Sequence, residues 1–474
     1  MGTILFRLSL LILCFCCLKL NPCSGADRIT ATQSLSGDQT IVSAGGAFEL
    51  GFFMPGKSEN YYIGIWYKQV SPRTVVWVAN RGSPVSNKFS SELRVSLNGC
   101  LALYNSSNVE IWSNRVSSAP HHSVQVVLLD DGNLVQLPNG SSPFPPNPPL
   151  WQSFDEPGDT WIPGSKIGFN KVTQRDISLT SWRNIEDPAP GPFLLKLGSN
   201  RSIELWKYYW PGHEWQRTLN FMNQFSYFDN QSETCLTYSQ HKGSLISRYV
   251  LDPGGQIQLL SWQEFTKRWL VIWRQPAFLY EIDRYCGPYG SFTGESGSSP
   301  CRCLTGFVPA SQVDYGSGAF YGGCYRSSPL RCDKTDRFWP IPVVRLPDNA
   351  RISAAGSSKE CETSCLSSCS CTAFSYNGTE CSVWYVDLLN MRQDVPSGQT
   401  ICINLAAEEF PSSNHKKWID VSCVMNQLLP ITRVIGRRLC WILYNYLTRP
   451  LKRKPTYGLE VCTCPPYHVL EDNG

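Results

Sequence analysis

Short apolar runs separated by turn residues dominate the chain from Asp27 to about Leu137. The runs are rich in β-branched and aromatic residues, and Gly, Asn, Asp and Pro lie between them, a pattern typical of strands joined by tight turns. No stretch keeps a 3.6-residue apolar period over twelve residues, so we expect few helices. The clearest predicted strands are residues 48–53, 62–67, 74–80, 124–129 and 134–137.

A second β-rich block runs from Trp151 to about Gln275 and contains many tryptophans, whose large rings we expect in a core. Ser141 to Pro149 separates the two blocks and holds several prolines, which predicts a stiff, exposed linker. The pattern therefore favours a mainly β chain built from successive domains.

Composition narrows the class of protein. The chain has 474 residues, 42% of them hydrophobic, which is enough apolar material for several cores. Its formal net charge of +4 is too small to indicate a nucleic-acid partner. Charged residues make up only 17% of the sequence, below the share of about 25% in soluble globular chains.

The N-terminus has the order of a secretory signal peptide, with Arg7, an apolar run from Leu8 to Leu18 and small residues up to Ala26. We expect residues 1–26 to be removed and the rest to be secreted into the extracellular space. Five Asn-x-Ser/Thr sequons fit that route. They predict N-glycosylation at Asn105, Asn139, Asn200, Asn230 and Asn377.

Eleven of the 21 cysteines lie between Cys286 and Cys402. Such density predicts small modules held by disulfides in an oxidising compartment. Zinc is the competing interpretation, because Cys361, Cys365, Cys369 and Cys371 are spaced like metal ligands. A secreted chain without a nearby histidine favours disulfides, so we expect no metal and no cofactor.

Several long motifs, in one order, resemble the ectodomains of plant S-receptor-like kinases and S-locus glycoproteins. The resemblance covers about residues 27–410. The motifs are the block from Leu35 to Phe53, Val76-Trp-Val-Ala-Asn-Arg81, Leu150-Trp-Gln-Ser-Phe-Asp-Glu-Pro-Gly-Asp-Thr160, Cys286-Gly-Pro-Tyr-Gly290, Cys301-Arg-Cys-Leu-Thr-Gly-Phe307 and Cys365-Leu-Ser-Ser-Cys-Ser-Cys-Thr-Ala373.

The resemblance implies a fold for each part. A bulb-type lectin domain, a β-prism of three sheets, would occupy residues 27–149, and a second lectin-like β region, the S-locus glycoprotein domain, residues 150–279. A small EGF-like module at 280–324 and an α+β PAN/apple module at 332–406 would follow, and then an atypical basic tail at 407–474.

The resemblance also implies disulfide pairings. They are Cys286–Cys301 and Cys303–Cys324 in the EGF-like module, and Cys361–Cys381, Cys365–Cys371 and, less securely, Cys332–Cys369 in the apple module. Tyr280 and Phe292 stand where the family has a further cysteine pair. The sequence thus predicts a looser EGF-like module, unless the two aromatic rings replace the missing bond by packing. Cys100, Cys235 and Cys402 lie outside the family's pattern.

Mannose-binding relatives use a Gln-x-Asp-x-Asn-x-Val-x-Tyr strand, whose alternate residues face one side. Here Asp131, Asn133 and Val135 match that motif, while its Gln and Tyr positions are Leu129 and Leu137. A weak carbohydrate site is one interpretation, and the other is that Asp131-Gly132-Asn133 is a hairpin turn.

No kinase or hydrolase signature occurs in the sequence, so we expect no catalysis by this chain. The resemblance implies extracellular recognition of a secreted cysteine-rich peptide or a glycan, as in pollen recognition, with a membrane receptor kinase ectodomain as a possible partner. The alternative function is a secreted mannose-type lectin. Charges at Asp420, Arg433 and Arg437 disfavour a membrane-spanning tail. Two interpretations of the tail remain: residues 418–474 are an altered reading of the gene, or Arg437 to Leu447 lies on a membrane surface as a basic amphipathic segment.

Overall fold

The computed structural model describes residues 26–57, 59–116, 124–142, 148–209, 213–220, 225–239, 246–294, 299–332, 335–393 and 399–410. The predictions for the signal peptide, for the tail beyond residue 410 and for residues 143–147 of the linker fall outside these residues.

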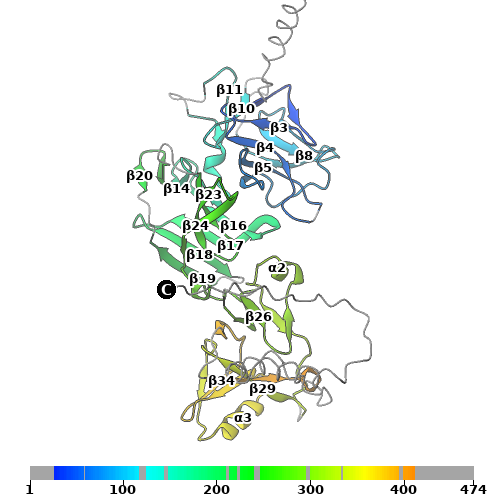
Figure 1. The fold of residues 1–474 in the computed structure, drawn as a ribbon, viewed down its shortest axis with the longest axis vertical. Helices are drawn as coiled ribbons and strands as arrows, with labels where there is room; N and C mark the ends of the chain where they lie inside the picture. The colour runs from blue at the N-terminus through cyan, green and yellow to red at the C-terminus, as the bar shows by residue number, and fades with distance from the viewer. Residues whose placement is uncertain are drawn as a thin grey trace, which may run out of the picture. The chain divides into compact units, whose positions relative to one another are not determined.

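Three four-stranded antiparallel sheets form the first part of the described chain, here called the first β unit, residues 28–152 (Figure 1). One sheet has the order β3 (Thr40–Val42), β4 (Phe48–Phe53), β5 (Tyr62–Tyr67), β6 (Val75–Val78). The next has the order β2 (Ser34–Leu35), β7 (Glu92–Val95), β8 (Leu101–Tyr104), β9 (Glu110–Ser113). The third has the order β1 (Arg28–Thr30), β10 (Val124–Leu128), β11 (Leu134–Pro138), β12 (Trp151–Gln152).

The three sheets share one apolar core, to which each contributes buried aliphatic side chains. These include Leu50, Ile65, Leu93, Leu103, Val126 and Leu134. Strand β5 is unusual because all six of its residues are buried. Its second face belongs to a separate cluster with Tyr62 and Trp66, against which Trp182 packs. Burial on both faces explains why this strand is a continuous apolar run rather than an alternating one.

A second set of three four-stranded antiparallel sheets follows, here called the second β unit, residues 160–275. The first sheet has the order β13 (Thr160–Trp161), β22 (Ser247–Leu251), β23 (Ile257–Gln263), β24 (Arg268–Gln275). The second has the order β15 (Arg175–Ile177), β14 (Lys166–Asn170), β21 (Glu233–Thr237), β20 (Ser226–Asp229). The third has the order β16 (Leu179–Asn184), β17 (Asp187–Leu197), β18 (Ile203–Tyr209), β19 (His213–Leu219). The prediction of a mainly β chain with two lectin-like regions is confirmed.

Arg81 connects the two β units. Its guanidinium donates hydrogen bonds to the backbone carbonyl oxygens of Pro188 at 2.6 Å, Thr180 at 2.9 Å and Ser181 at 2.7 Å. Burial lowers the pKa of Arg81, while the carboxylates of Asp159 and Asp187 oppose that shift. Because a guanidinium stays protonated even when it is buried, Arg81 keeps donating these hydrogen bonds to the second β unit.

The remaining described residues form two smaller sheets and an α/β module. Strands β26 (Cys301–Cys303), β25 (Gly290–Phe292) and β33 (Met391–Arg392) make one sheet, and β27 (Phe307–Pro309) with β28 (Cys324–Arg326) makes another, next to helix α2 (Gln312–Gly316). A five-stranded sheet has the order β29 (Arg337–Val343), β34 (Gln399–Leu405), β31 (Ala373–Tyr376), β32 (Cys381–Trp384), β30 (Arg351–Ser353). Short 3₁₀ turns lie at Ser153–Asp155, Leu279–Glu281 and Ala407–Glu409.

Helix α3 (Ser358–Leu366) packs on the five-stranded sheet because disulfides attach its buried face. Ser357 caps the helix by accepting a hydrogen bond from the Glu360 amide. Cys361 and Cys365 are one turn apart and buried, and they bond to Cys381 of β32 and to Cys371. The other disulfides of the structure are Cys286–Cys301, Cys303–Cys324 and Cys332–Cys369. Cys100, Cys235 and Cys402 are outside any disulfide.

Tyr280 and Phe292, which stand at the positions of the absent cysteine pair, are in direct contact. Their ring centroids are 5.7 Å apart in an edge-to-face arrangement, and the Arg392 guanidinium lies 3.8 Å from the Tyr280 ring centroid. Phe292 is only 4% exposed. This packing favours the interpretation that the two rings replace the absent disulfide.

We predict that Phe292→Ala lowers the free energy of unfolding by about 3–5 kcal/mol, because it removes a buried ring beside the Cys286–Cys301 disulfide and leaves a cavity. Thermal unfolding of the purified chain measures the effect as a drop in Tm. Phe265→Ala is the matched control, since Phe265 is 99% exposed and its loss should change stability by less than about 0.5 kcal/mol. Equal Tm values for the two variants would contradict a stabilising role of Phe292.

Lys207 of β18 is a buried lysine that contacts the chain just before Cys286. Its side chain is 1% exposed, and its ammonium donates to the carbonyl oxygens of Asp283 at 2.6 Å and Arg284 at 3.0 Å. Burial lowers the pKa of Lys207 to about 7, and the Asp283 carboxylate only partly opposes this shift. Compared with the unfolded chain, the folded state therefore favours the uncharged form of Lys207.

This shift predicts a pH dependence of stability. Between pH about 7 and the unfolded pKa of about 10.4, the unfolded state holds a proton that the folded state has released, so the free energy of unfolding rises with pH. The wild type should gain up to about 1.4 kcal/mol per pH unit relative to Lys207→Met across this window. Denaturant unfolding at pH 7, 8 and 9 tests this, and parallel pH profiles would show that Lys207 does not titrate there.

Candidate functional site

The three residues retained from the sugar-binding motif lie on and beside the hairpin that joins β10 to β11. Gly132 has φ +87°, a conformation that favours glycine. The Leu129 amide donates to the Asn133 carbonyl at 2.9 Å, and the Asn133 amide donates to Asp131 Oδ1 at 2.9 Å. Asp131-Gly132-Asn133 is thus a hydrogen-bonded turn, and the side chains of Asp131, Asn133 and Val135 lie in three different surroundings.

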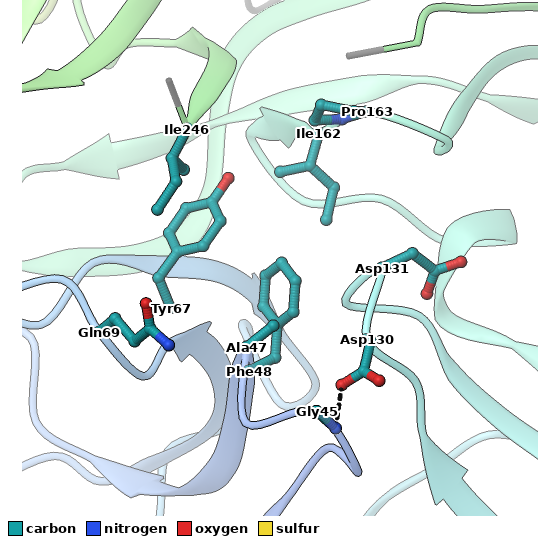
Figure 2. Close-up of a pocket in the computed structure, with 10 residues that line it drawn as sticks. All are labelled: Gly45, Ala47, Phe48, Tyr67, Gln69, Asp130, Asp131, Ile162, Pro163 and Ile246. Carbon is teal, nitrogen blue, oxygen red and sulfur yellow. Dashed lines mark hydrogen bonds between the residues drawn. The ribbon is translucent and has the colours of Figure 1, made fainter. Parts of the chain in front are cut away.

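Asp131 lies at the edge of a cavity of about 320 Å³ (Figure 2). The cavity is lined by Asp130 and Asp131 of the hairpin, by Phe48 and Tyr67 of the first β unit, and by Ile162 of the second. Asp130 Oδ1 accepts a hydrogen bond from the Gly45 amide at 2.7 Å, which fixes that carboxylate beside the turn before β4. Asp130 and Asp131 therefore both line a space that residues from both β units enclose, and Figure 2 shows the Asp131 carboxylate turned away from Phe48 and Tyr67.

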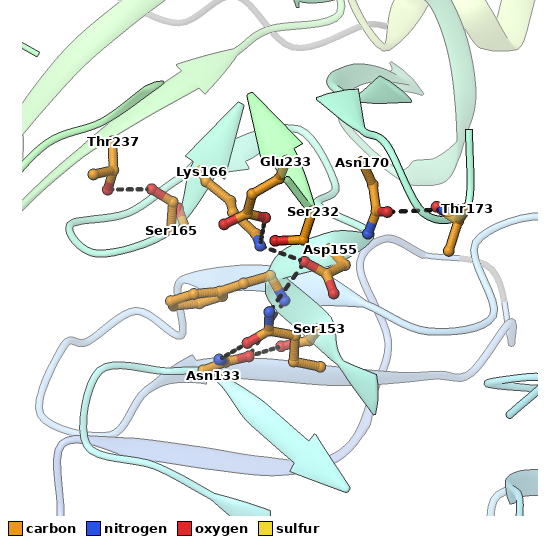
Figure 3. A network of polar contacts seen from close by, with 12 residues as sticks. Asn133, Ser153, Asp155, Ser165, Lys166, Asn170, Thr173, Ser232, Glu233 and Thr237 are labelled. Atoms are coloured by element: carbon orange, nitrogen blue, oxygen red, sulfur yellow. Dashed lines mark hydrogen bonds and ion pairs between the residues drawn. The ribbon is translucent and has the colours of Figure 1, made fainter. Parts of the chain in front are cut away.

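Asn133 points the other way, into a buried polar network (Figure 3). Asn133 is only 6% exposed, and its side-chain amide nitrogen donates to Gln152 Oε1 at 2.9 Å. Its Oδ1 accepts from the Ser153 hydroxyl at 3.2 Å and from the Phe154 amide at 3.3 Å. These hydrogen bonds link the Asn133 side chain to β12 and to the turn that follows. Its polar atoms are therefore used within the fold.

The same network reaches the second β unit. Gln152 donates to Asp155 at 3.1 Å, and Asp155 pairs with Lys166 of β14 at 2.9 Å (Figure 3). Lys166 also pairs with Glu233 of β21. Burial disfavours the charged ammonium, but the two carboxylates outweigh burial and raise the pKa of Lys166. Asn133 is thus the first member of a chain of polar contacts between the units.

Val135 lies in a small apolar cluster with Val127 and Leu137, and Leu129 packs against it. The two positions where the motif has Gln and Tyr are therefore leucines that help to bury Val135. The structure separates the predicted site residues: Asp131 borders a cavity, Asn133 is hydrogen-bonded inside, and Val135 is packed.

Four of the predicted glycosylation sites, Asn139, Asn200, Asn230 and Asn377, are exposed, and Asn105 is half-buried. Glycosylation at these positions stays a prediction. Within the described residues, no group of three or more His, Cys, Asp or Glu side chains is placed to hold a metal ion. The described helices include none that is both long and apolar enough to cross a membrane.

Comparison with known families agrees with this architecture. Residues 74–183 match the D-mannose binding lectin family, residues 205–311 the S-locus glycoprotein domain, and residues 332–391 the PAN-like domain. An S-locus-specific glycoprotein of Brassica oleracea is 34% identical over 432 residues, which cover 85% of this chain and 97% of that protein. The chain belongs to the S-locus glycoprotein family, together with the ectodomains of the G-type lectin S-receptor-like kinases.

The kinases of this family are longer than the region that aligns with this chain. A G-type lectin S-receptor-like serine/threonine-protein kinase of Arabidopsis thaliana is 39% identical over 421 residues, which cover 84% of this chain and 50% of the kinase. A second Arabidopsis kinase of this type is 33% identical, with 56% of its length covered. The chain thus spans about half the length of these kinases. Among solved structures, a monomeric mannose-binding lectin from Gastrodia elata aligns with 27% of this chain and 96% of its own, at 18% identity and a TM-score of 0.20.

The cavity residues of this family member could not be found from the motif. Phe48 and Tyr67 were recognisable only as parts of apolar strands, and Ile162 lies outside the lectin region that the resemblance implied. They meet because the second β unit covers the open side of the first. Asp131 is the single residue that both the motif and the cavity share.

We predict that Asn133→Ala lowers the stability of the first β unit by about 2–3 kcal/mol, because it leaves buried groups of Ser153 and Phe154 without their acceptor. Thermal unfolding would detect the loss. Asn98→Ala, at an exposed turn, is the matched control and should leave Tm unchanged. If Asn133→Ala had a normal Tm but altered sugar binding, the Asn133 side chain would instead contact a ligand.

Proposed function

We propose that this chain is a non-catalytic extracellular recognition protein, which binds a secreted cysteine-rich peptide or a glycan and associates with a membrane receptor kinase ectodomain. The observation that carries the proposal is the alignment with an S-locus-specific glycoprotein over 97% of that protein's length. The three matched families are binding domains, which supports recognition rather than chemistry.

The disulfides support an extracellular location. Five disulfides lie in the two C-terminal modules, and such bonds persist in oxidising compartments. Small modules depend on such bonds because their cores are thin. We therefore propose that the chain is secreted and acts outside the cell, with pollen recognition as the process known for the S-locus branch of its family.

The geometry favours this role over a mannose lectin that uses β11. Asn133 already makes three side-chain hydrogen bonds within the fold, and Leu129 and Leu137 pack against Val135 instead of offering polar groups. A mannose ligand on this strand would find only Asp131 facing outward. We expect no retention of the chain on a mannose matrix through this strand.

The test is association of the full chain with a receptor ectodomain. A tagged chain is expressed in plant cells, recovered from the culture medium and passed over immobilised ectodomains of S-receptor-like kinases. We expect saturable association with at least one ectodomain at micromolar concentration or below, and loss of binding after reduction of the disulfides. Recovery of the chain only in a carbonate-resistant membrane pellet would overturn secretion, and no association with any ectodomain would overturn the partner.

A further inference from the structure

Strand β24 is the outer strand of its sheet, and its middle is apolar and exposed. It pairs with β23 on one side (Figure 1), and no backbone group of the described residues forms a hydrogen bond with its other side. Leu270, Val271 and Ile272 are 52%, 45% and 47% exposed. A β-bulge opposite Leu259 and Leu260 interrupts the usual alternation here. Three similar exposures in a row mean that neither face of the strand is fully covered.

This exposure does not come from a loosely held strand, because a tryptophan anchors β24 on each side of the apolar segment. Trp269 Nε1 donates a hydrogen bond to Thr74 Oγ1 at 3.0 Å. Trp273 packs edge-to-face on Tyr249, with ring centroids 6.0 Å apart. The three aliphatic side chains between the two tryptophans therefore lie on a fixed surface.

The edge of β24 also lacks the residues that usually block pairing with another chain, which are proline and lysine above all. Strand β29, the outer strand of the five-stranded sheet, carries Pro340 and Pro342, which have no amide proton to donate. The eight residues of β24 include neither proline nor lysine. Phe265 and Phe278, just beyond its two ends in the sequence, are 99% and 47% exposed. Exposed apolar residues gathered in this way are typical of a protein contact.

The order of residues along β24 indicates which partner fits. Arg268-Trp-Leu-Val-Ile-Trp-Arg274 reads almost the same in both directions about Val271, with only Leu270 and Ile272 exchanged. Two copies related by a two-fold axis through Val271 would run antiparallel, with tryptophan beside tryptophan and Leu270 beside Ile272. Each copy would then cover on the other the surface that it exposes itself, and the two open strand edges would meet. The arginines would also stand opposite each other, and like charges in that position weaken a strand pair.

We infer that β24 is a self-association surface, at which two copies of this chain join their sheets edge to edge about Val271. The opposed arginines and the bulge limit the strength of this contact, so we expect a dimer with a Kd of about 1–100 µM. Higher salt screens the repulsion between the arginines and should therefore strengthen the dimer. The inference goes beyond the proposed function and does not rest on it, since it needs neither a ligand nor a receptor.

Sedimentation equilibrium of the purified full chain, at concentrations up to about 200 µM, measures this association directly. Val271→Lys places a charge at the two-fold axis and should raise the dimer Kd at least about tenfold. Val172→Lys is the matched control, because it makes the same change in the turn after β14 at a residue that is 74% exposed. The control should associate like the wild type. Both variants should keep the Tm of the wild type, which separates loss of the dimer from loss of the fold.

A charge exchange tests the register. Arg268→Glu places a carboxylate opposite Arg274 of the second copy, so the dimer Kd should fall about five- to tenfold and the dimer should now weaken with salt. The double variant Arg268→Glu/Arg274→Glu restores like charges and should return the Kd to near the wild-type value. A wild-type chain that stays monomeric at about 200 µM would overturn the inference. So would a Val271→Lys chain that dimerises like the wild type, or an Arg268→Glu chain that dimerises no more tightly.

Discussion

The contact between the two β units is the constraint on which the rest of the described structure depends. Strand β5 of the first unit is buried on both faces, so it needs a cover that its own three sheets do not supply. The second unit provides that cover with Trp182, and the Arg81 guanidinium fixes it through three backbone carbonyls. A charged group that donates from Nε and Nη2 to three carbonyl oxygens gives this contact a defined geometry as well as burial.

The same contact determines what surrounds two residues of the sugar-binding motif, Asp131 and Asn133. Once the second unit is in place, Asn133 fastens β12 and connects through Asp155 to Lys166 of β14. An amide committed to buried hydrogen bonds is expensive to release, so it is no longer free for a ligand. Asp131 keeps its solvent-facing position, and Ile162 encloses the space in front of it. The motif residues therefore have three separate surroundings and share no common face.

The C-terminal modules show a second way to stabilise a thin core. Disulfides hold helix α3 to its sheet, whereas Tyr280 and Phe292, beside the Cys286–Cys301 disulfide, are held by the contact between their rings. Arg392 of β33 covers the Tyr280 ring, and β33 pairs with β25 in parallel. Aromatic packing at this point therefore also attaches strand β33 to β25.

The sequence alone determined the β class, the strands at residues 48–53 and 62–67, and the family, because apolar runs, turn residues and long motifs are local properties of the chain. It also identified Asp131, Asn133 and Val135, but not what each side chain does. Only the tertiary structure decided that one borders a cavity, one is hydrogen-bonded inside and one is packed. The physical reason is that the surroundings of Asp131 and Asn133 come from Gln152, Ile162 and Lys166, which lie about 20 to 35 residues away along the chain, whereas Val135 packs on its neighbours Val127 and Leu137. Which of them comes near is set by how the two units bury β5 together, and no local pattern contains that information.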